Sequence, residues 1–117
     1  MDLSEVTLRY YRAVDAGDVD AVVDWFADDA VYHRPGYEPI RGREAIAAFY
    51  GGTRVIASGS HRLEQLIVQD RSVAVRGVFT GRLKDGSDVT IGFSDFVDYD
   101  PAGRAAHRRS YFDIPAV

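Results

Sequence analysis

DVTIGFSDFVDY, residues 88–99, alternates strictly between two kinds of side chain. The even positions are mostly small or polar, whereas the odd positions are apolar with one exception, Asp95. Period-two alternation of this kind predicts a β-strand with one face packed on a core. We therefore expect a strand over 88–99 that carries the carboxyl group of Asp95 on its apolar face, beside Phe93 and Val97.

Alternation continues on both sides of this strand. Further strands are predicted near residues 62–69, 72–83 and 104–112. The joins are rich in Asp, Gly, Ser and Pro, the residue types that form tight turns between antiparallel strands. They read Asp70-Arg71, Lys84-Asp85-Gly86-Ser87 and Asp100-Pro101-Ala102-Gly103. The second half of the chain thus predicts an antiparallel meander.

The first half shows helical spacing instead. A helix with Val6, Tyr10, Ala13 and Val14 on its apolar stripe is expected to end at Gly17. Asp18 is placed to cap a second helix, which runs through Phe26 to Asp28-Asp29. A short strand over 30–34, a loop with Pro35, Gly36 and Pro39, and a third helix from Gly42 to the stop at Gly51-Gly52 complete this half.

Helices followed by a meander predict one α+β domain over residues 1–117, with a curved antiparallel sheet wrapped around three N-terminal helices. The composition, 46% hydrophobic and 27% charged, is that of a folded globular domain. With a net charge of −4 we expect no nucleic-acid partner, and we interpret the basic run 104–109 mainly as a solvated face. The chain has no cysteine, no apolar run of membrane-spanning length and no signal-like N-terminus, so we expect a cytoplasmic protein without a membrane partner.

Asp95 allows two interpretations. A buried carboxyl group can be kept neutral by desolvation and can then donate a hydrogen bond to developing negative charge. Alternatively, it is ionised and pairs with an arginine that reaches inward, such as Arg76 or Arg108. The residue pattern by itself favours neither.

Other polar residues carry weaker signals. Tyr10, Tyr32 and Tyr50 are ordinary candidates for core tyrosines whose hydroxyls find a partner. The three histidines, His33, His61 and His107, have no spacing typical of metal ligation, so no metal is expected. His33 is expected to point away from a pocket unless Pro35 bends the strand, and Ser58-Gly59-Ser60 is expected to be a loop.

Several segments together resemble a known family: Arg9-Tyr10, 14–18 (VDAGD), 27–30 (ADDA), 42–50 (GREAIAAFY) and 110–113 (SYFD). They are similar to bacterial ketosteroid isomerases and, more broadly, to the SnoaL-like branch of the nuclear transport factor 2-like superfamily. The resemblance covers nearly the whole chain. It implies a cone-shaped, cystatin-like α+β barrel, commonly a homodimer, with a small hydrophobic molecule as partner and no cofactor.

The resemblance also implies roles for individual residues. Tyr10 falls at the position of the oxyanion-hole tyrosine, Asp95 at that of a protonated oxyanion-hole acid, and Tyr50 at that of a tyrosine that tunes the first. These three are the expected catalytic residues. Substrate-binding positions are expected at Tyr32, Arg34, Phe93 and Phe112.

Arg34 departs from the isomerase pattern. The position before Pro35 holds the general base in the isomerases, and an arginine cannot exchange a proton near neutral pH. Arg34 can instead bind a carboxylate, phosphate or enolate, and His33 or Glu38 is left as an alternative base. The related epoxide hydrolases use an aspartate–arginine–aspartate set; Arg76 matches the arginine, but Val78 and Ser110 stand at the acid positions.

Two functions follow as expectations. The first is an isomerase-, cyclase- or lyase-type enzyme that stabilises an enolate-like intermediate of a steroid- or polyketide-like carbonyl compound. The second is a non-catalytic ligand-binding or accessory domain that keeps the pocket and has lost the base.

Overall fold

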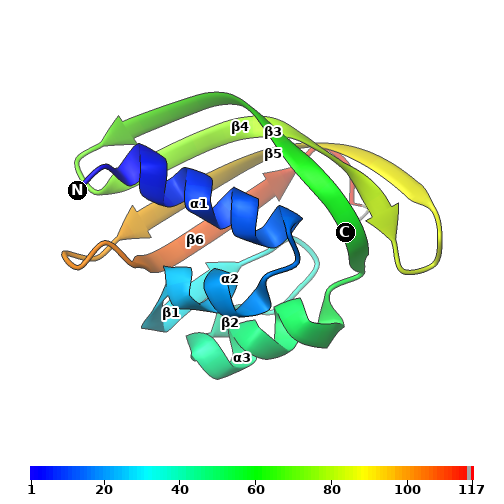
Figure 1. The fold of residues 1–117 in the computed structure, drawn as a ribbon, viewed down its shortest axis with the longest axis horizontal. Coiled ribbons are helices and arrows are strands. Elements are labelled where there is room, and N and C mark those ends of the chain that lie inside the picture. Colours follow the sequence, from blue (N-terminus) through cyan, green and yellow to red (C-terminus); the bar gives the residue numbers. More distant parts are fainter. Residues whose placement is uncertain (116) are drawn as a thin grey trace.

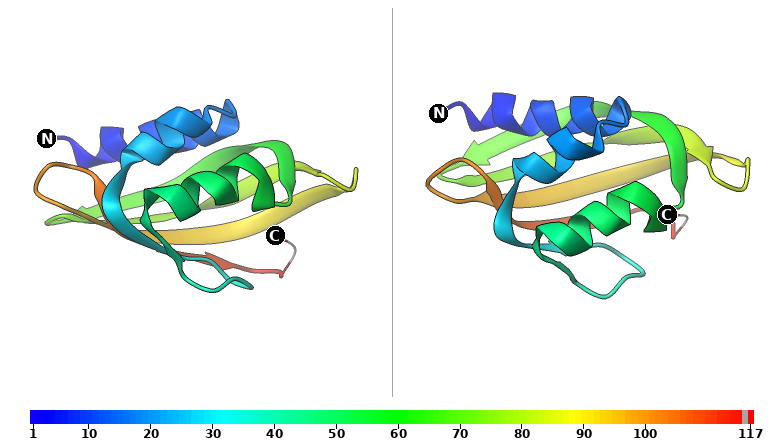
Figure 2. Two further views of the ribbon diagram at one scale, coloured as in Figure 1. Left: turned by 90° about the horizontal axis from the view of Figure 1, so that it is seen from below. Right: turned by 60° about the horizontal axis from the view of Figure 1, so that its bottom comes forward.

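The computed structural model describes residues 1–115 and 117 and shows one curved sheet with helices on a single face (Figures 1 and 2). Six strands lie in the order β2-β1-β6-β5-β4-β3. Helices α1 and α2 and the segment formed by α3 and η1 all pack on the concave side. The α+β prediction is therefore confirmed. Among the residues that the structure describes, no helix is long and apolar enough to cross a membrane.

Helix α1 begins and ends, and helix α2 begins, where local chemistry predicts. Helix α1, Leu3–Asp15, starts after Asp2, whose carboxylate accepts from the backbone N–H of Ser4 at 3.0 Å. Gly17 follows with φ +71°, a left-handed conformation that glycine adopts at little cost. Helix α2, Val19–Trp25, is capped by Asp18, which accepts from the N–H of Ala21 at 3.1 Å.

The next segment differs from the prediction. Strand β1 spans Phe26–His33, so helix α2 ends at Trp25 and Asp28-Asp29 lie within the strand. Phe26 is fully buried and pairs with Ala105 of β6, so tertiary pairing overrides the helical spacing of the apolar residues before it. A two-residue strand, β2 (Ile40–Arg41), also forms, followed by α3 (Gly42–Ala48) and a π-helical turn, η1 (Phe49–Thr53).

The predicted meander is present, with one strand longer than expected. It consists of β3 (Ile56–Gln69), β4 (Ser72–Leu83), β5 (Asp88–Tyr99) and β6 (Ala105–Phe112), each antiparallel to the next. The expected loop at Ser58-Gly59-Ser60 is instead part of β3 and pairs with Thr80, Gly81 and Arg82 of β4. Cross-strand hydrogen bonding therefore outweighs the weak strand preference of these small residues.

The sheet as a whole is mixed and open. β1 pairs parallel to β6, whereas every other neighbouring pair is antiparallel. β2 and β3 form the two edges and do not pair with each other in the part of the chain that the structure describes, so the sheet remains unclosed. The parallel pair brings the end of β1, where Arg34 follows His33, alongside the inward-facing residues of β6.

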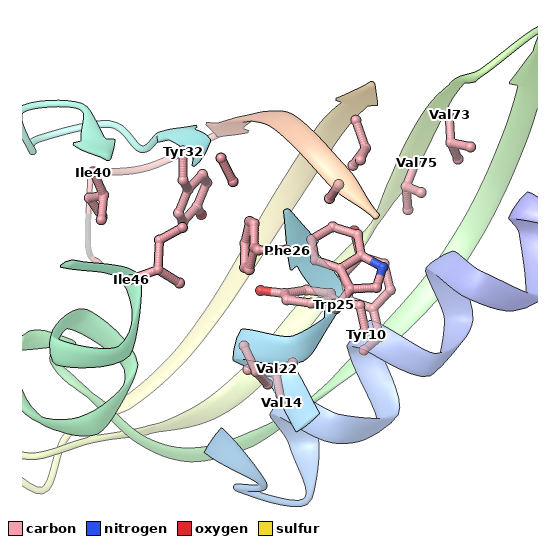
Figure 3. Packing of buried hydrophobic residues seen from close by; sticks show 14 of the residues in the cluster. Tyr10, Val14, Val22, Trp25, Phe26, Tyr32, Ile40, Ile46, Val73 and Val75 are labelled. Carbon is pink, nitrogen blue, oxygen red and sulfur yellow. The ribbon is translucent and has the colours of Figure 1, made fainter. Parts of the chain in front are cut away.

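Aromatic side chains pack between the helices and the sheet (Figure 3). The rings of Tyr10 and Trp25 lie 4.4 Å apart, and those of Trp25 and Phe26 lie 4.8 Å apart. Ile46 of α3 and Tyr32 of β1 close the other side of this cluster. Helix and sheet are thus held together by the same residues that surround the polar groups described next.

Two glycines shape the wall of the cavity. Gly59 of β3 pairs with Gly81 of β4, and the ring of Phe79 lies against both. A Cβ at Gly59 would come within 2.4 Å of that ring, and one at Gly81 within 2.6 Å. The two glycines therefore allow Phe79 to lie flat over the strands and to line the cavity.

Candidate active site

A narrow cavity lies between the concave face of the sheet and the helices. A wider hollow, open to solvent, adjoins it and shares Arg54, Ile56 and Phe79. The polar residues that line the narrow cavity are Tyr10, Arg34, Arg54, His61, Asp95 and Arg108. Its apolar walls include Ile56, Phe79, Ile91, Phe93 and Phe112.

Asp95 forms a buried ion pair with Arg108. Arg108 Nη2 lies 2.9 Å from Asp95 Oδ2, and the two side chains are only 4% and 1% exposed. Ser110 Oγ donates to Asp95 Oδ1 at 2.5 Å, and the Tyr11 hydroxyl donates to Oδ2. Burial by itself raises the pKa of Asp95, but the Arg108 guanidinium and the bonds from Ser110 and Tyr11 outweigh it and leave the pKa lowered.

Asp95 is therefore an ionised acceptor and not the neutral donor that the resemblance implies. The other interpretation of the sequence, pairing with Arg108, is confirmed. The reason is the register of the sheet, which sets Asp95 opposite Ser110 and brings Arg108 onto the same face. The basic run 104–109 is thus only partly a solvated face, because Arg108 points inward.

Tyr10 and Tyr50 meet above this ion pair. Their hydroxyl oxygens are 2.5 Å apart, and Arg108 Nη1 donates to Tyr10 at 2.6 Å and to Tyr50 at 2.9 Å. The Arg108 guanidinium also lies over the Tyr10 ring at 4.4 Å. Burial raises the pKa of Tyr10 well above its usual value and raises that of Tyr50, although Arg108 opposes both shifts. Both tyrosines are therefore neutral near pH 7.

Arg34 is joined to the same hydrogen-bond network through Tyr32. Its Nη1 donates to the Tyr32 hydroxyl at 3.0 Å, and that hydroxyl lies 2.8 Å from Ser110 Oγ. The guanidinium sits between the rings of Phe49 and Phe112, at 5.1 and 5.0 Å from their centroids. Burial by itself lowers the pKa of Arg34, but Tyr32 and Tyr50 outweigh it and leave the pKa raised.

The buried charges of the network do not cancel. Arg34 and Arg108 are 7% and 4% exposed, and Asp95 is the acid that pairs with Arg108. Within the part of the chain that the structure describes, no acidic side chain pairs with Arg34. Its Nε and Nη2 reach only the backbone oxygen of Val117, at a weak 3.4 Å. The Arg34 guanidinium therefore has no acidic side chain as a partner among the described residues, and it can bind an acceptor oxygen.

The expected alternative bases lie outside this cavity. His33 is on the outer side of β1, where its ring lies 4.8 Å from that of His107, because burial keeps alternating through Tyr32, His33 and Arg34. Glu38 is exposed in the loop before β2 and does not line the cavity. Arg76, the match to the epoxide-hydrolase arginine, is on the outer face and pairs with Glu64 at 3.3 Å.

Sequence reasoning missed a second acid–base contact, between His61 of β3 and Asp15 at the end of α1. His61 Nδ1 lies 2.5 Å from Asp15 Oδ1, and the imidazole lines the narrow cavity. The two residues are far apart in the chain, and the expected loop at residues 58–60 obscured the face on which His61 points. Extending the alternation of β3 backward from Leu63 would have been the available signal. In the described ranges 1–115 and 117, no group of three His, Asp or Glu residues is placed to hold a metal ion.

Comparisons with known proteins agree with the fold. A family model described as a SnoaL-like domain matches residues 7–108. The epoxide hydrolase LasB of Streptomyces lasalocidi is 49% identical over 45 residues, which are 38% of this chain and 16% of that protein, so the match spans a small part of this relative.

Solved structures show the same fold. SalBIII, described as an epoxide hydrolase/cyclase-like enzyme in pyran ring formation of salinomycin, superposes with a TM-score of 0.84 at 24% identity, over 96% of this chain and 91% of its own. A protein from Catenulispora acidiphila with a ketosteroid isomerase-like fold, bound to trimethylamine, gives 0.84 at 16% identity, over 97% and 88%. At these identities the superpositions establish the fold alone.

Proposed function

Because the chain belongs to the SnoaL-like domain family, we propose that it is a small-molecule enzyme that stabilises an enolate-like anion of a hydrophobic carbonyl compound, steroid- or polyketide-like. The observation that carries the proposal is the buried network in which two arginines face one carboxylate. Tyr10 and Arg34 are the proposed donors to the substrate oxygen. Phe93 and Phe112, which line the cavity, are proposed to contact the carbon skeleton.

Charge balance supports an anionic intermediate. A buried charge is costly unless a partner compensates it, and the pairing of Arg108 with Asp95 leaves Arg34 without an acidic side-chain partner among the described residues. A negative charge that develops on a bound oxygen would compensate Arg34. Because Arg34 is held between Phe49 and Phe112 before the charge appears, little reorganisation is needed as it forms.

Proton counting at the tyrosine pair supports the same role for Tyr10. Two neutral hydroxyls carry two protons, and one of them is used in the bond between Tyr10 and Tyr50. Arg108 only donates to the pair, so it accepts neither proton. One O–H therefore remains available, and Tyr10 is the member of the pair that lines the narrow cavity.

Asp95 has a supporting role in this proposal. Its carboxylate holds Arg108, and Arg108 in turn holds both tyrosine hydroxyls. Asp95 thus acts through Arg108 and is a positioning residue. Tyr50 tunes Tyr10 by direct hydrogen bonding, as expected from the family resemblance.

The second candidate, a binding or accessory domain, is favoured by one observation. Arg34 stands at the position of the usual base, where it can grip an acidic ligand without any proton transfer. The two functions differ in turnover: a binder would gain thermal stability from acidic ligands and convert none of a panel of unsaturated and enolisable ketones. Turnover of one such ketone would exclude the binder.

The anion site can be tested with 2-naphthol, whose ionised form absorbs differently from its neutral form. We expect the wild-type protein to bind 2-naphthol and to shift it toward naphtholate at a pH where free naphthol is neutral. Loss of one hydrogen bond to a charged group costs about 1.5–3 kcal/mol. Tyr10→Phe should therefore lower the equilibrium constant for ionisation of bound naphthol by roughly ten- to a hundredfold.

The matched control is Tyr111→Phe, which removes the same hydroxyl from an exposed tyrosine on the outer face of the sheet. This variant should titrate like the wild type. An equal ionised fraction in Tyr10→Phe and wild type would contradict the proposed donor role of Tyr10.

A further inference from the structure

His61 and Asp15 form a contact that the anion site does not use. Asp15 is the last residue of α1, and His61 lies in β3, which packs against α1. Asp15 Oδ2 accepts from the backbone N–H of His61 at 2.9 Å, and Oδ1 lies 2.5 Å from ring Nδ1. The backbone bond alone would tie α1 to β3, so that structural role does not require the imidazole.

The carboxylate determines which nitrogen of His61 is free. An ionised carboxylate only accepts hydrogen bonds, so Nδ1 must carry the proton that points at Asp15. In the neutral ring Nε2 is then the unprotonated nitrogen, and it is a base. Among the described residues Nε2 has no hydrogen-bond partner, and it is not one of the fully buried nitrogens that lack a partner. The His61 side chain as a whole is 11% exposed.

The surroundings of His61 place this base at the anion site. The imidazole lines the same narrow cavity as Tyr10 and Arg34. Apolar rings cover it from the sheet: Phe79 of β4 at 4.8 Å and Phe93 of β5 at 5.3 Å. Two titratable groups near it lie on α1: Asp15 and Tyr11, and the Tyr11 ring is 5.1 Å from the imidazole. The charged groups across the cavity are Arg54, Asp95 and Arg108.

From this geometry we infer that His61 is the proton-transfer residue of the cavity and that Asp15 is its positioning residue. The inference rests on the proposed function. Nε2 takes a proton from the carbon next to the substrate carbonyl; the electron pair of the broken C–H bond forms the C=C bond of an enolate, whose oxygen faces Tyr10 and Arg34. The imidazolium then returns the proton to carbon, so the enzyme is unchanged.

A pair of bicyclic probes tests the base and the anion site separately. 2-Tetralone has acidic protons next to its carbonyl, and their exchange for deuterium in D₂O is measured by NMR. 2-Naphthol has the same ring skeleton and reports binding at the anion site. We expect wild-type protein to accelerate the exchange, with a rate that rises with pH through one deprotonation. His61→Gln should lower the catalysed rate by about a hundredfold or more, the usual contribution of a general base.

The control is His107→Gln, the same substitution on the outer face, which should leave the exchange rate and its pH profile unchanged. Asp15→Asn should lower the rate by about tenfold or more, because the ring loses the partner that fixes its tautomer. Both cavity variants should keep naphthol affinity within about threefold of wild type, since they leave the proposed donors in place.

The possible failures are distinct. Unchanged exchange in His61→Gln, or no exchange by wild-type protein that binds naphthol, would overturn the role of His61 while the anion site stands. Catalysed exchange without naphthol binding would overturn the anion site instead. Nitrogen-15 NMR of the wild-type protein adds a test independent of variant folding: Nδ1 of His61 should carry the proton, and Nε2 should shift when naphthol is added. A proton on Nε2 would overturn the inference.

Discussion

Replacing Arg108 by methionine tests the network at its centre. The substitution removes three hydrogen bonds, to Tyr10 at 2.6 Å and to Tyr50 and Asp95 at 2.9 Å each. Among the described residues, it also leaves the Asp95 carboxylate, 1% exposed, with only Tyr11 and Ser110 as donors. Breaking a buried ion pair by removing one partner costs about 3–5 kcal/mol, which is a large part of the roughly 5–15 kcal/mol that stabilises a typical domain.

Urea unfolding followed by fluorescence measures this loss directly. Trp25 is the single tryptophan of the chain and packs on Tyr10, so its emission reports the same region. Arg82→Met is the matched control, since Arg82 and Asp88 form an exposed pair at 3.2 Å, and exposed pairs contribute about 0–1 kcal/mol. Adding Asp95→Asn to Arg108→Met should recover part of the loss, because the unpaired charge disappears.

The pH dependence follows from the sign of the Asp95 shift. In the folded wild-type protein the pKa of Asp95 is lowered, so Asp95 stabilises the fold above its unfolded pKa, and this stability is lost as pH falls through the folded pKa. Without Arg108, burial raises the pKa of Asp95, and acidification relieves the buried charge. The difference between Arg108→Met and wild type should therefore be larger at pH 7 than at about pH 4, near the usual carboxyl pKa. A loss at pH 7 no greater than that of Arg82→Met would refute the reasoning.

Two further predictions concern the sheet. A Cβ at Gly77 would lie 2.4 Å from the backbone oxygen of Arg62, so Gly77→Ala should lower the free energy of unfolding in urea by about 1–3 kcal/mol. Gly51→Ala is the control: a Cβ there would have nothing within 4 Å, and the change in stability should be smaller. A homodimer through the open sheet face is proposed from the family resemblance, and Phe96 and Tyr111, each 52% exposed with rings 5.9 Å apart, lie on that face. Sedimentation should show a wild-type dimer and a Phe96→Glu monomer; a wild-type monomer at all concentrations would contradict the proposal.

The fold follows largely from local patterns in the chain. Helical spacing with Asp18 and Gly17 at the boundary predicts the first two helices, and strict alternation over 88–99 predicts which residues of β5 face inward. These features depend on side chains close in sequence, which act through capping, backbone conformation and one-sided burial. Pairing with a distant strand determines the conformation of Phe26 and of Ser58-Gly59-Ser60, so local preference predicts the wrong structure there.

The site divides in the same way. The sequence alone marked Asp95 as a buried acid, and the family resemblance marked Tyr10, Tyr50 and Arg34 as its neighbours. Only the tertiary structure decided that Asp95 is an ionised partner of Arg108, and only it brought His61 onto Asp15. The charge of a buried group depends on which opposite charge and which donors reach it, and those groups come from strands and helices whose register no local pattern fixes.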